Sequence, residues 1–198
     1  MGEKLYLDAQ TLLEDSFRLG AQIINSGFEP TFIVALWRGG APMGIAVQEF
    51  LRYHGIHTDH IAIRTEYYSS SSIDDTAREV AVYGINYLVN NCSHDDRLLF
   101  VDDVFDTGKT MQAVIQRVRQ LARRNTPDEI RVAVPYYKPA RNQTTLEPDF
   151  YLYATEQWLK YPHSLEGLSD AEIARHRPQL AAILAEAKPV LDPVTKRP

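Results

Sequence analysis

Short apolar segments alternate with segments of helical periodicity along most of this chain. The segment Thr31 to Trp37 (TFIVALW) is continuously apolar and rich in β-branched residues, which predicts a strand buried on both faces. Buried strands that alternate with helices are typical of α/β proteins. The sequence therefore predicts an α/β fold with a mainly parallel, twisted sheet, helices on both of its faces, and ligands at the carboxyl ends of the strands.

The other periodicities extend this pattern. Apolar residues at helical spacing predict three helices, at Asp8 to Ser26, Ala41 to Tyr53 and Thr107 to Arg124. Further strands are expected at Asp59 to Thr65, Val80 to Val82, Arg97 to Asp102, Glu129 to Val134 and Asp149 to Ala154. Four serines mark the segment Tyr67 to Glu79 as a mobile loop. A capping box formed by Ser169 and Glu172 predicts a helical C-terminal extension over about residues 169–190.

Length and charge limit the classes of partner. A chain of 198 residues is expected to form a single domain, residues 1–198. The net charge of −5 argues against nonspecific nucleic-acid binding, which needs a basic surface. No uncharged apolar run approaches the ~18 residues of a membrane-spanning helix, and the first residues lack the order of a signal peptide. We therefore expect a cytoplasmic protein with neither a nucleic-acid nor a membrane partner.

The segment Leu98 to Thr110 (LLFVDDVFDTGKT) combines an apolar strand, carboxylates and a helix start. Gly108 allows backbone N–H groups to converge, and the helix start and the hydroxyls of Thr107 and Thr110 add further donors, so this loop can cradle a phosphate. Asp102 and Asp103 would face the attached sugar, where carboxylates accept hydrogen bonds from ribose hydroxyls or organise a magnesium ion.

A Walker A loop is the competing interpretation of Gly108-Lys109-Thr110. That loop requires a glycine five positions before Gly108, and the residue there is Asp103. A carboxylate would place negative charge where the loop must wrap phosphates. The spacing therefore excludes a P-loop nucleotidase.

The same segment resembles the 5-phosphoribosyl-1-diphosphate (PRPP) signature of the type I phosphoribosyltransferases. That signature is an apolar strand, two acids, two further residues, Asp-Thr-Gly, then Lys or Gly, and Thr. The run from Asp102 to Thr110 fits it throughout, with Asp106 as its third acid and Lys109 after the glycine. The resemblance implies that this loop binds PRPP, that Asp106 is catalytic, and that Asp103 contacts Mg²⁺.

A second segment resembles the diphosphate-binding loop of the same family. Trp37, Arg38, Gly39 and Gly40 directly follow the first predicted buried strand. The resemblance implies that the arginine and the two glycines hold the pyrophosphate. It also implies a non-proline cis peptide bond between Trp37 and Arg38.

Two further segments resemble the 6-oxopurine branch of the family, including the xanthine-guanine enzymes. Lys138, in Tyr-Lys-Pro-Ala, matches the lysine that donates to the purine 6-oxo group, and a lysine cannot accept a hydrogen bond from the 6-amino group of adenine. Trp158 matches the aromatic ring that stacks on the base, and Leu159 matches the residue whose backbone lies near the 2-position. These residues belong to a hood expected largely over residues 136–166.

The resemblance implies a reaction and its requirements. N9 of hypoxanthine, guanine or xanthine would displace pyrophosphate from PRPP, with Mg²⁺ as cofactor and Asp106 as general base or acceptor at N7. Tyr67, Tyr68 and Ser69 would begin a flap that closes over the site. Many relatives have a tryptophan and an acid near His163, whereas the nearest acid here is Glu166, so a metal role for Glu166 is doubtful.

Two alternatives stay open at this stage. One is a phosphoribosyltransferase with another acceptor base, which Lys138 and Trp158 disfavour. The other is a regulator that binds PRPP or a nucleotide without catalysis. The preference among the 6-oxopurines stays open too, and so does the choice between a homodimer and a homotetramer.

Overall fold

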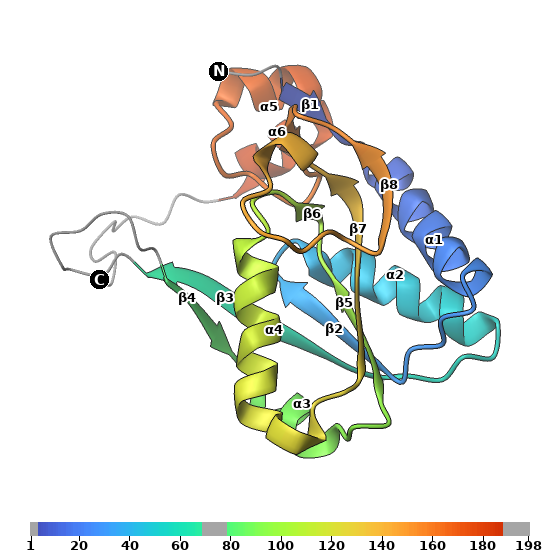
Figure 1. Cartoon of the computed structure of the whole chain (residues 1–198). Coiled ribbons are helices and arrows are strands. Elements are labelled where there is room, and N and C mark those ends of the chain that lie inside the picture. Colours follow the sequence, from blue (N-terminus) through green and yellow to red (C-terminus); the bar gives the residue numbers. More distant parts are fainter. Residues whose placement is uncertain (1–3, 69–78, 188–198) are drawn as a thin grey trace, which may run out of the picture.

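The computed structural model describes residues 4–68 and 79–187, and its centre is a seven-stranded sheet (Figure 1). The strands lie in the order β4-β3-β2-β5-β7-β6, and β8 also pairs with β7. Every pairing is parallel except that of β3 with β4. The bounds are β2 Phe32–Trp37, β3 Asp59–Tyr68, β4 Glu79–Tyr83, β5 Arg97–Val101, β6 Val104–Phe105, β7 Glu129–Tyr137 and β8 Phe150–Ala154. This confirms the predicted α/β fold.

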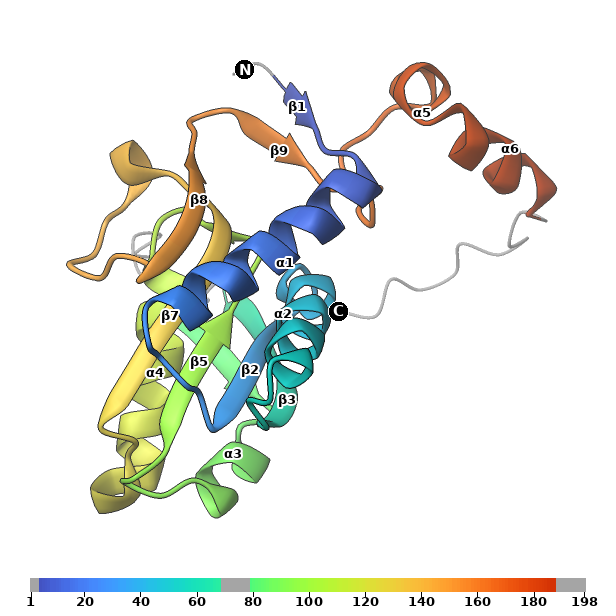
Figure 2. The same cartoon turned by 90° about the vertical axis from the view of Figure 1, so that its right-hand side faces the viewer.

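Helices cover both faces of the sheet (Figure 2). One face packs against α1 and α2, and the opposite face packs against α3 and α4. Successive residues of β5 alternate between the two apolar cores: Leu98 and Phe100 join the α4 side, while Leu99 and Val101 join the α1–α2 side. All four are fully buried, which is why the strand is apolar without a break. The helices are α1 Ala9–Asn25, α2 Gly40–Tyr53, α3 Asn86–Asn91 and α4 Lys109–Ala122, and the 3₁₀ turn Arg123–Asn125 follows α4.

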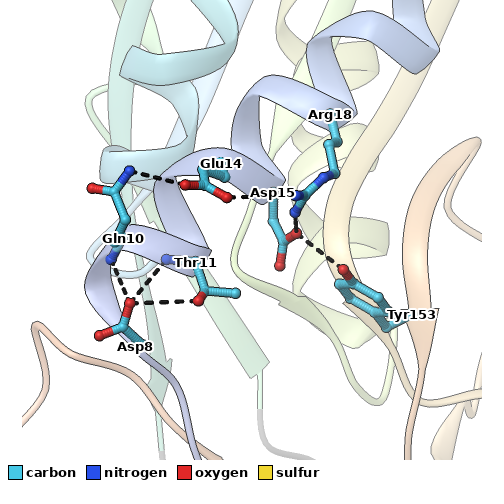
Figure 3. A network of polar contacts seen from close by, with 7 residues as sticks. All are labelled: Asp8, Gln10, Thr11, Glu14, Asp15, Arg18 and Tyr153. Carbon is cyan, nitrogen blue, oxygen red and sulfur yellow. Dashed lines mark hydrogen bonds and ion pairs between the residues drawn. The ribbon is translucent and has the colours of Figure 1, made fainter.

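Polar contacts fix α1 at its start and against the sheet (Figure 3). The carboxylate of Asp8 accepts hydrogen bonds from the backbone N–H groups of Gln10 and Thr11 and so caps the helix. Two turns further on, the buried carboxylate of Asp15 contacts Arg18 at 2.5 Å and accepts from the Tyr153 hydroxyl of β8 at 3.0 Å. The helix is thereby joined to the strand that leads toward the hood.

A second sheet, of two strands, forms part of the hood. Strand β1 (Lys4–Tyr6) pairs in parallel with β9 (Trp158–Lys160), so the N-terminal segment joins the hood although the sequence patterns predict no strand there. The extension forms α5 (Asp170–His176), which starts at the predicted capping box, and α6 (Pro178–Glu186). Arg177, between these helices, donates to the carbonyl oxygens of Tyr161 at 2.6 Å and Ser164 at 2.8 Å. The extension is therefore tied to the hood.

One loop prediction is wrong at its edges. The segment Tyr67 to Glu79 was expected to be a loop, but β3 continues through Tyr68 and β4 begins at Glu79, because the two strands pair antiparallel and lengthen each other. Tyr67 and Tyr68 are therefore strand residues, and a flap that begins at them stays a prediction. Ser69 lies outside the described residues. In the described part of the chain, no helix is both long and apolar enough to cross a bilayer.

Candidate active site

Two loops meet at the carboxyl ends of β2 and β5. Gly39 lies against the carboxylate of Asp103, and Gly40 lies against the backbone of Val101 and Asp102. A Cβ atom on either glycine would overlap these neighbours, so only glycine allows this approach. The segment expected to bind diphosphate and the acidic segment thus form one continuous surface, and the peptide bond that joins Trp37 to Arg38 is cis, as predicted.

The adjacent acids are poorly solvated. Burial raises the pKa of Asp103 to about 6, and burial together with the neighbouring Asp103 charge raises the pKa of Asp102 well above its ordinary value. Backbone N–H groups partly compensate, since that of Asp103 donates to the Asp102 carboxylate at 2.9 Å. Such a pair is stabilised by hydroxyl donors or by a cation. Two carboxylates together with substrate oxygens are a typical Mg²⁺ ligand set, whereas the described residues hold no cluster of three or more His, Cys, Asp or Glu side chains suited to a metal.

A small cavity of about 170 Å³ follows the acids, between β5 and α4. Gly108 precedes α4 with φ of +76°, which lets the chain turn so that the first N–H groups of the helix face the cavity. Its volume and donors suit a phosphate group. The exposed side chain of Lys109 does not line this cavity but a different surface, beside β4. The lining residues are Asp102, Asp103, Val104, Phe105, Asp106, Thr107, Gly108, Thr110 and Met111.

A larger cleft of about 410 Å³ opens on the other side of Asp106, between the sheet and the hood. Lys138 lies in it, with only 4% of its surface exposed, and its ammonium is 3.4 Å from the Asp106 carboxylate and 5.8 Å from the centre of the Trp158 ring. Leu159 also lines the cleft. The three residues predicted to bind a base are thus brought together beside the predicted catalytic acid.

Two residues of this region carry no sequence prediction. Arg141 donates to the Asp106 carboxylate at 2.6 Å, so that Asp106 contacts two cations. Lys160, at the end of β9, is 6% exposed and lines the cleft. The sequence signals are weak: Arg141 lies three positions after Lys138, and Lys160 lies two positions after Trp158, hence on the same side of the strand.

Arg38 reaches across the site to the hood. Its guanidinium is 3.1 Å from the carboxylate of Glu166, and both side chains are exposed. Tyr161 makes a second link, because its hydroxyl donates to the backbone carbonyl of Asp103 at 2.8 Å. Burial raises the pKa of Tyr161 well above its ordinary value, which keeps this hydroxyl protonated as a donor. The hood is therefore joined to both the diphosphate loop and the acidic loop.

Comparison with known proteins identifies the family of the chain. The family model described as "Phosphoribosyl transferase domain" matches residues 4–168. No curated protein matches by sequence.

Solved structures share the fold at low sequence identity. A purine phosphoribosyltransferase from Pyrococcus horikoshii Ot3 has a TM-score of 0.65 at 24% identity, covering 84% of this chain and 97% of its own. A hypothetical protein from Neisseria gonorrhoeae with bound ppGpp has a TM-score of 0.72 at 21% identity, covering 92% and 98%. The xanthine-guanine-hypoxanthine phosphoribosyltransferase of Helicobacter pylori has a TM-score of 0.58 at 17% identity, covering 81% and 92%.

Proposed function

This chain belongs to the phosphoribosyl transferase domain family, and from that premise we propose that it transfers the 5-phosphoribosyl group of PRPP to N9 of a 6-oxopurine. The reaction releases pyrophosphate and forms the 5′-mononucleotide, which is the chemistry of purine salvage. The observation that carries the proposal is the meeting of Lys138, Asp106 and Trp158 in one cleft, directly beside the phosphate-sized cavity.

PRPP would lie along the contact between the two loops. Its 5-phosphate would occupy the cavity at the start of α4, where backbone N–H groups and the hydroxyls of Thr107 and Thr110 can donate. The ribose hydroxyls would donate to the carboxylates of Asp102 and Asp103. The pyrophosphate would lie at Gly39 and Gly40, where close backbone approach and Arg38 stabilise the charge that develops on it.

Magnesium fits this arrangement. Burial raises the pKa values of Asp102 and Asp103, and a divalent cation brought in by PRPP would stabilise their charged forms. We assign Asp103, with Asp102 beside it, as the protein contact of that cation. When bound, the cation would offset negative charge on the pyrophosphate.

The base would bind in the larger cleft. Trp158 offers a ring for stacking, and the backbone near Leu159 would face the edge of the base that carries the 2-position. Lys138 would donate to the 6-oxo group, and Asp106 would accept a proton or a hydrogen bond at N7 as N9 attacks the anomeric carbon. The contact of Lys138 and Arg141 with Asp106 keeps this carboxylate in place before the base arrives.

Replacing Lys138 tests the assignment of the base class. Lys138→Met should lower kcat/KM for hypoxanthine by roughly 10²-fold or more, because the buried 6-oxo group would lose a charged donor, while the low activity with adenine should not fall in parallel. Arg52→Met, which removes an exposed charge at the end of α2, is the matched control and should change neither value. An unchanged base preference in Lys138→Met would remove this residue from the specificity site.

A nucleotide-binding regulator is the second candidate. The structure from Neisseria gonorrhoeae contains ppGpp, a guanine nucleotide, on the same fold. A regulator would bind nucleotides in the same cleft but would not consume PRPP. Turnover therefore separates the two candidates.

A further inference from the structure

Lys160 places a second buried cation in the cleft proposed to hold the base. Only 6% of this residue is exposed, although lysine is rarely buried without a partner charge. Its ammonium donates to the carbonyl oxygens of Glu166 at 3.1 Å and Gly167 at 3.3 Å. In the described part of the chain no carboxylate oxygen lies within 4.0 Å of it, and its hydrogen-bond partners are these two neutral carbonyl groups.

The ammonium groups of Lys160 and Lys138 both lie beside the Trp158 ring. They are 5.7 Å and 5.8 Å from its centre, respectively. Lys138 comes from the end of β7 in the core, and Lys160 comes from β9 in the hood. A purine stacked on Trp158 would therefore meet two cations, one carried by the core and one by the hood.

The 6-oxopurines differ in the group at the 2-position, which is hydrogen in hypoxanthine, an amino group in guanine and an oxo group in xanthine. An ammonium has three N–H donors and no acceptor, and two of the donors of Lys160 go to carbonyls. The third can donate to a 2-oxo group but opposes a 2-amino group, which is itself a donor.

We propose that Lys160 recognises the 2-oxo group and makes xanthine the preferred base. This inference rests on the proposed function and goes beyond it, because Lys138 alone does not distinguish the three bases. The wild-type protein should use xanthine with a kcat/KM at least about 10-fold above that for guanine, as expected for a hydrogen bond to a charged donor.

The test compares kcat/KM for xanthine, guanine and hypoxanthine in the wild type, Lys160→Met and Lys160→Arg. Lys160→Met should lower the ratio of kcat/KM for xanthine to kcat/KM for guanine by about 10- to 100-fold. Lys160→Arg, which keeps the charge, should retain most of this ratio. Two further variants serve as controls. Lys138→Met should lower kcat/KM for all three bases by a similar factor and so leave the xanthine-to-guanine ratio unchanged. Arg52→Met should change neither the three kcat/KM values nor their ratio.

Binding without turnover provides the second measurement. Calorimetric titration of the wild type with xanthosine 5′-monophosphate and guanosine 5′-monophosphate should show tighter binding of the former, and Lys160→Met should remove the difference. An unchanged ratio in Lys160→Met, or a wild type that prefers guanine, would overturn the inference and leave the proposed function standing. Failure to convert any of the three bases would instead overturn the proposed function.

Discussion

Two glycines determine how closely the diphosphate loop approaches the acidic loop. Neither position has room for a side chain: a Cβ atom at Gly39 would overlap the Asp103 carboxylate, and one at Gly40 would overlap the backbone of Val101 and Asp102. The chemistry of PRPP requires this closeness, because pyrophosphate and ribose must be held by neighbouring groups. The role of the pair is therefore steric as well as a matter of backbone donors.

Gly39→Ala should reduce activity more than stability. The added methyl group must displace the Asp103 carboxylate, so we expect kcat/KM with PRPP to fall by roughly 10²-fold or more, with a loss of about 1–3 kcal/mol in the free energy of unfolding. Gly20→Ala is the matched control, because its Cβ would press on Phe50 between α1 and α2, far from the acids. It should keep its turnover whatever its change in stability; equal turnover losses in both variants would contradict the steric role.

Asp106→Asn should lower kcat by roughly 10²-fold or more if this carboxylate accepts the proton or hydrogen bond at N7. Arg141→Gln is the comparison, because it breaks the 2.6 Å contact with Asp106 but leaves the carboxylate. Steady-state kinetics with hypoxanthine should show a much smaller effect for Arg141→Gln. Near-normal turnover in Asp106→Asn would exclude the catalytic role.

At this scale the sequence predicts the acidic loop, the diphosphate loop and the residues of the base cleft, because each lies in a contiguous motif. Arg141 and Lys160 escape prediction because their roles depend on burial and on which loops face each other. Lys109 shows the converse, since it belongs to the signature but its side chain points away from the cavity.

Among the elements, the least expected contact joins β1 to α5, and we call it the clasp. Lys4 and Tyr6 of β1 contact the carboxylate of Glu172 in α5, and the Tyr6 ring stacks on His176 at 3.8 Å. Hydrogen bonds, first with Lys4 and then with Ser169 and Tyr6, hold the pKa of Glu172 well below its ordinary value of 4.5. The clasp supports β9, which carries Trp158 and Lys160.

The clasp should weaken at acid pH. A carboxylate with a lowered folded-state pKa contributes stability that is fully present above its unfolded value of 4.5 and is lost progressively as the pH falls toward the folded value. Thermal unfolding of the wild type and of Glu172→Gln should therefore differ by a constant amount above pH 4.5 and converge below it. A difference that does not change with pH would show that ionisation of Glu172 contributes nothing.

Hydrophobic periodicity predicts the long elements, such as α4 and β5, because their apolar residues pack at regular spacing into the cores on the two faces of the sheet. It misses β1 and β9, which have three residues each and form only by pairing across more than 150 positions. It predicts β3 and β4 too short for a related reason, because antiparallel pairing and not core contact determines where these strands end.

For the whole molecule, the net charge of −5 contrasts with a substrate that carries a phosphate and a pyrophosphate. The site resolves this locally: backbone donors at two loops, Arg38 and a cation at Asp103 would meet the anionic groups, while Lys138, Lys160 and Arg141 surround the base cleft. Binding of this kind depends on geometry and short-range contacts more than on the average field of the protein.

Turnover of the wild-type protein tests this account most directly. The protein would be incubated with PRPP, Mg²⁺ and one base at a time, chosen from hypoxanthine, guanine, xanthine, adenine and uracil, and both nucleotide and pyrophosphate would be measured. The account predicts equal amounts of 5′-mononucleotide and pyrophosphate with the 6-oxopurines and little product with adenine or uracil. Binding of PRPP or nucleotide without product from any base, or a preference for adenine or uracil, would contradict it.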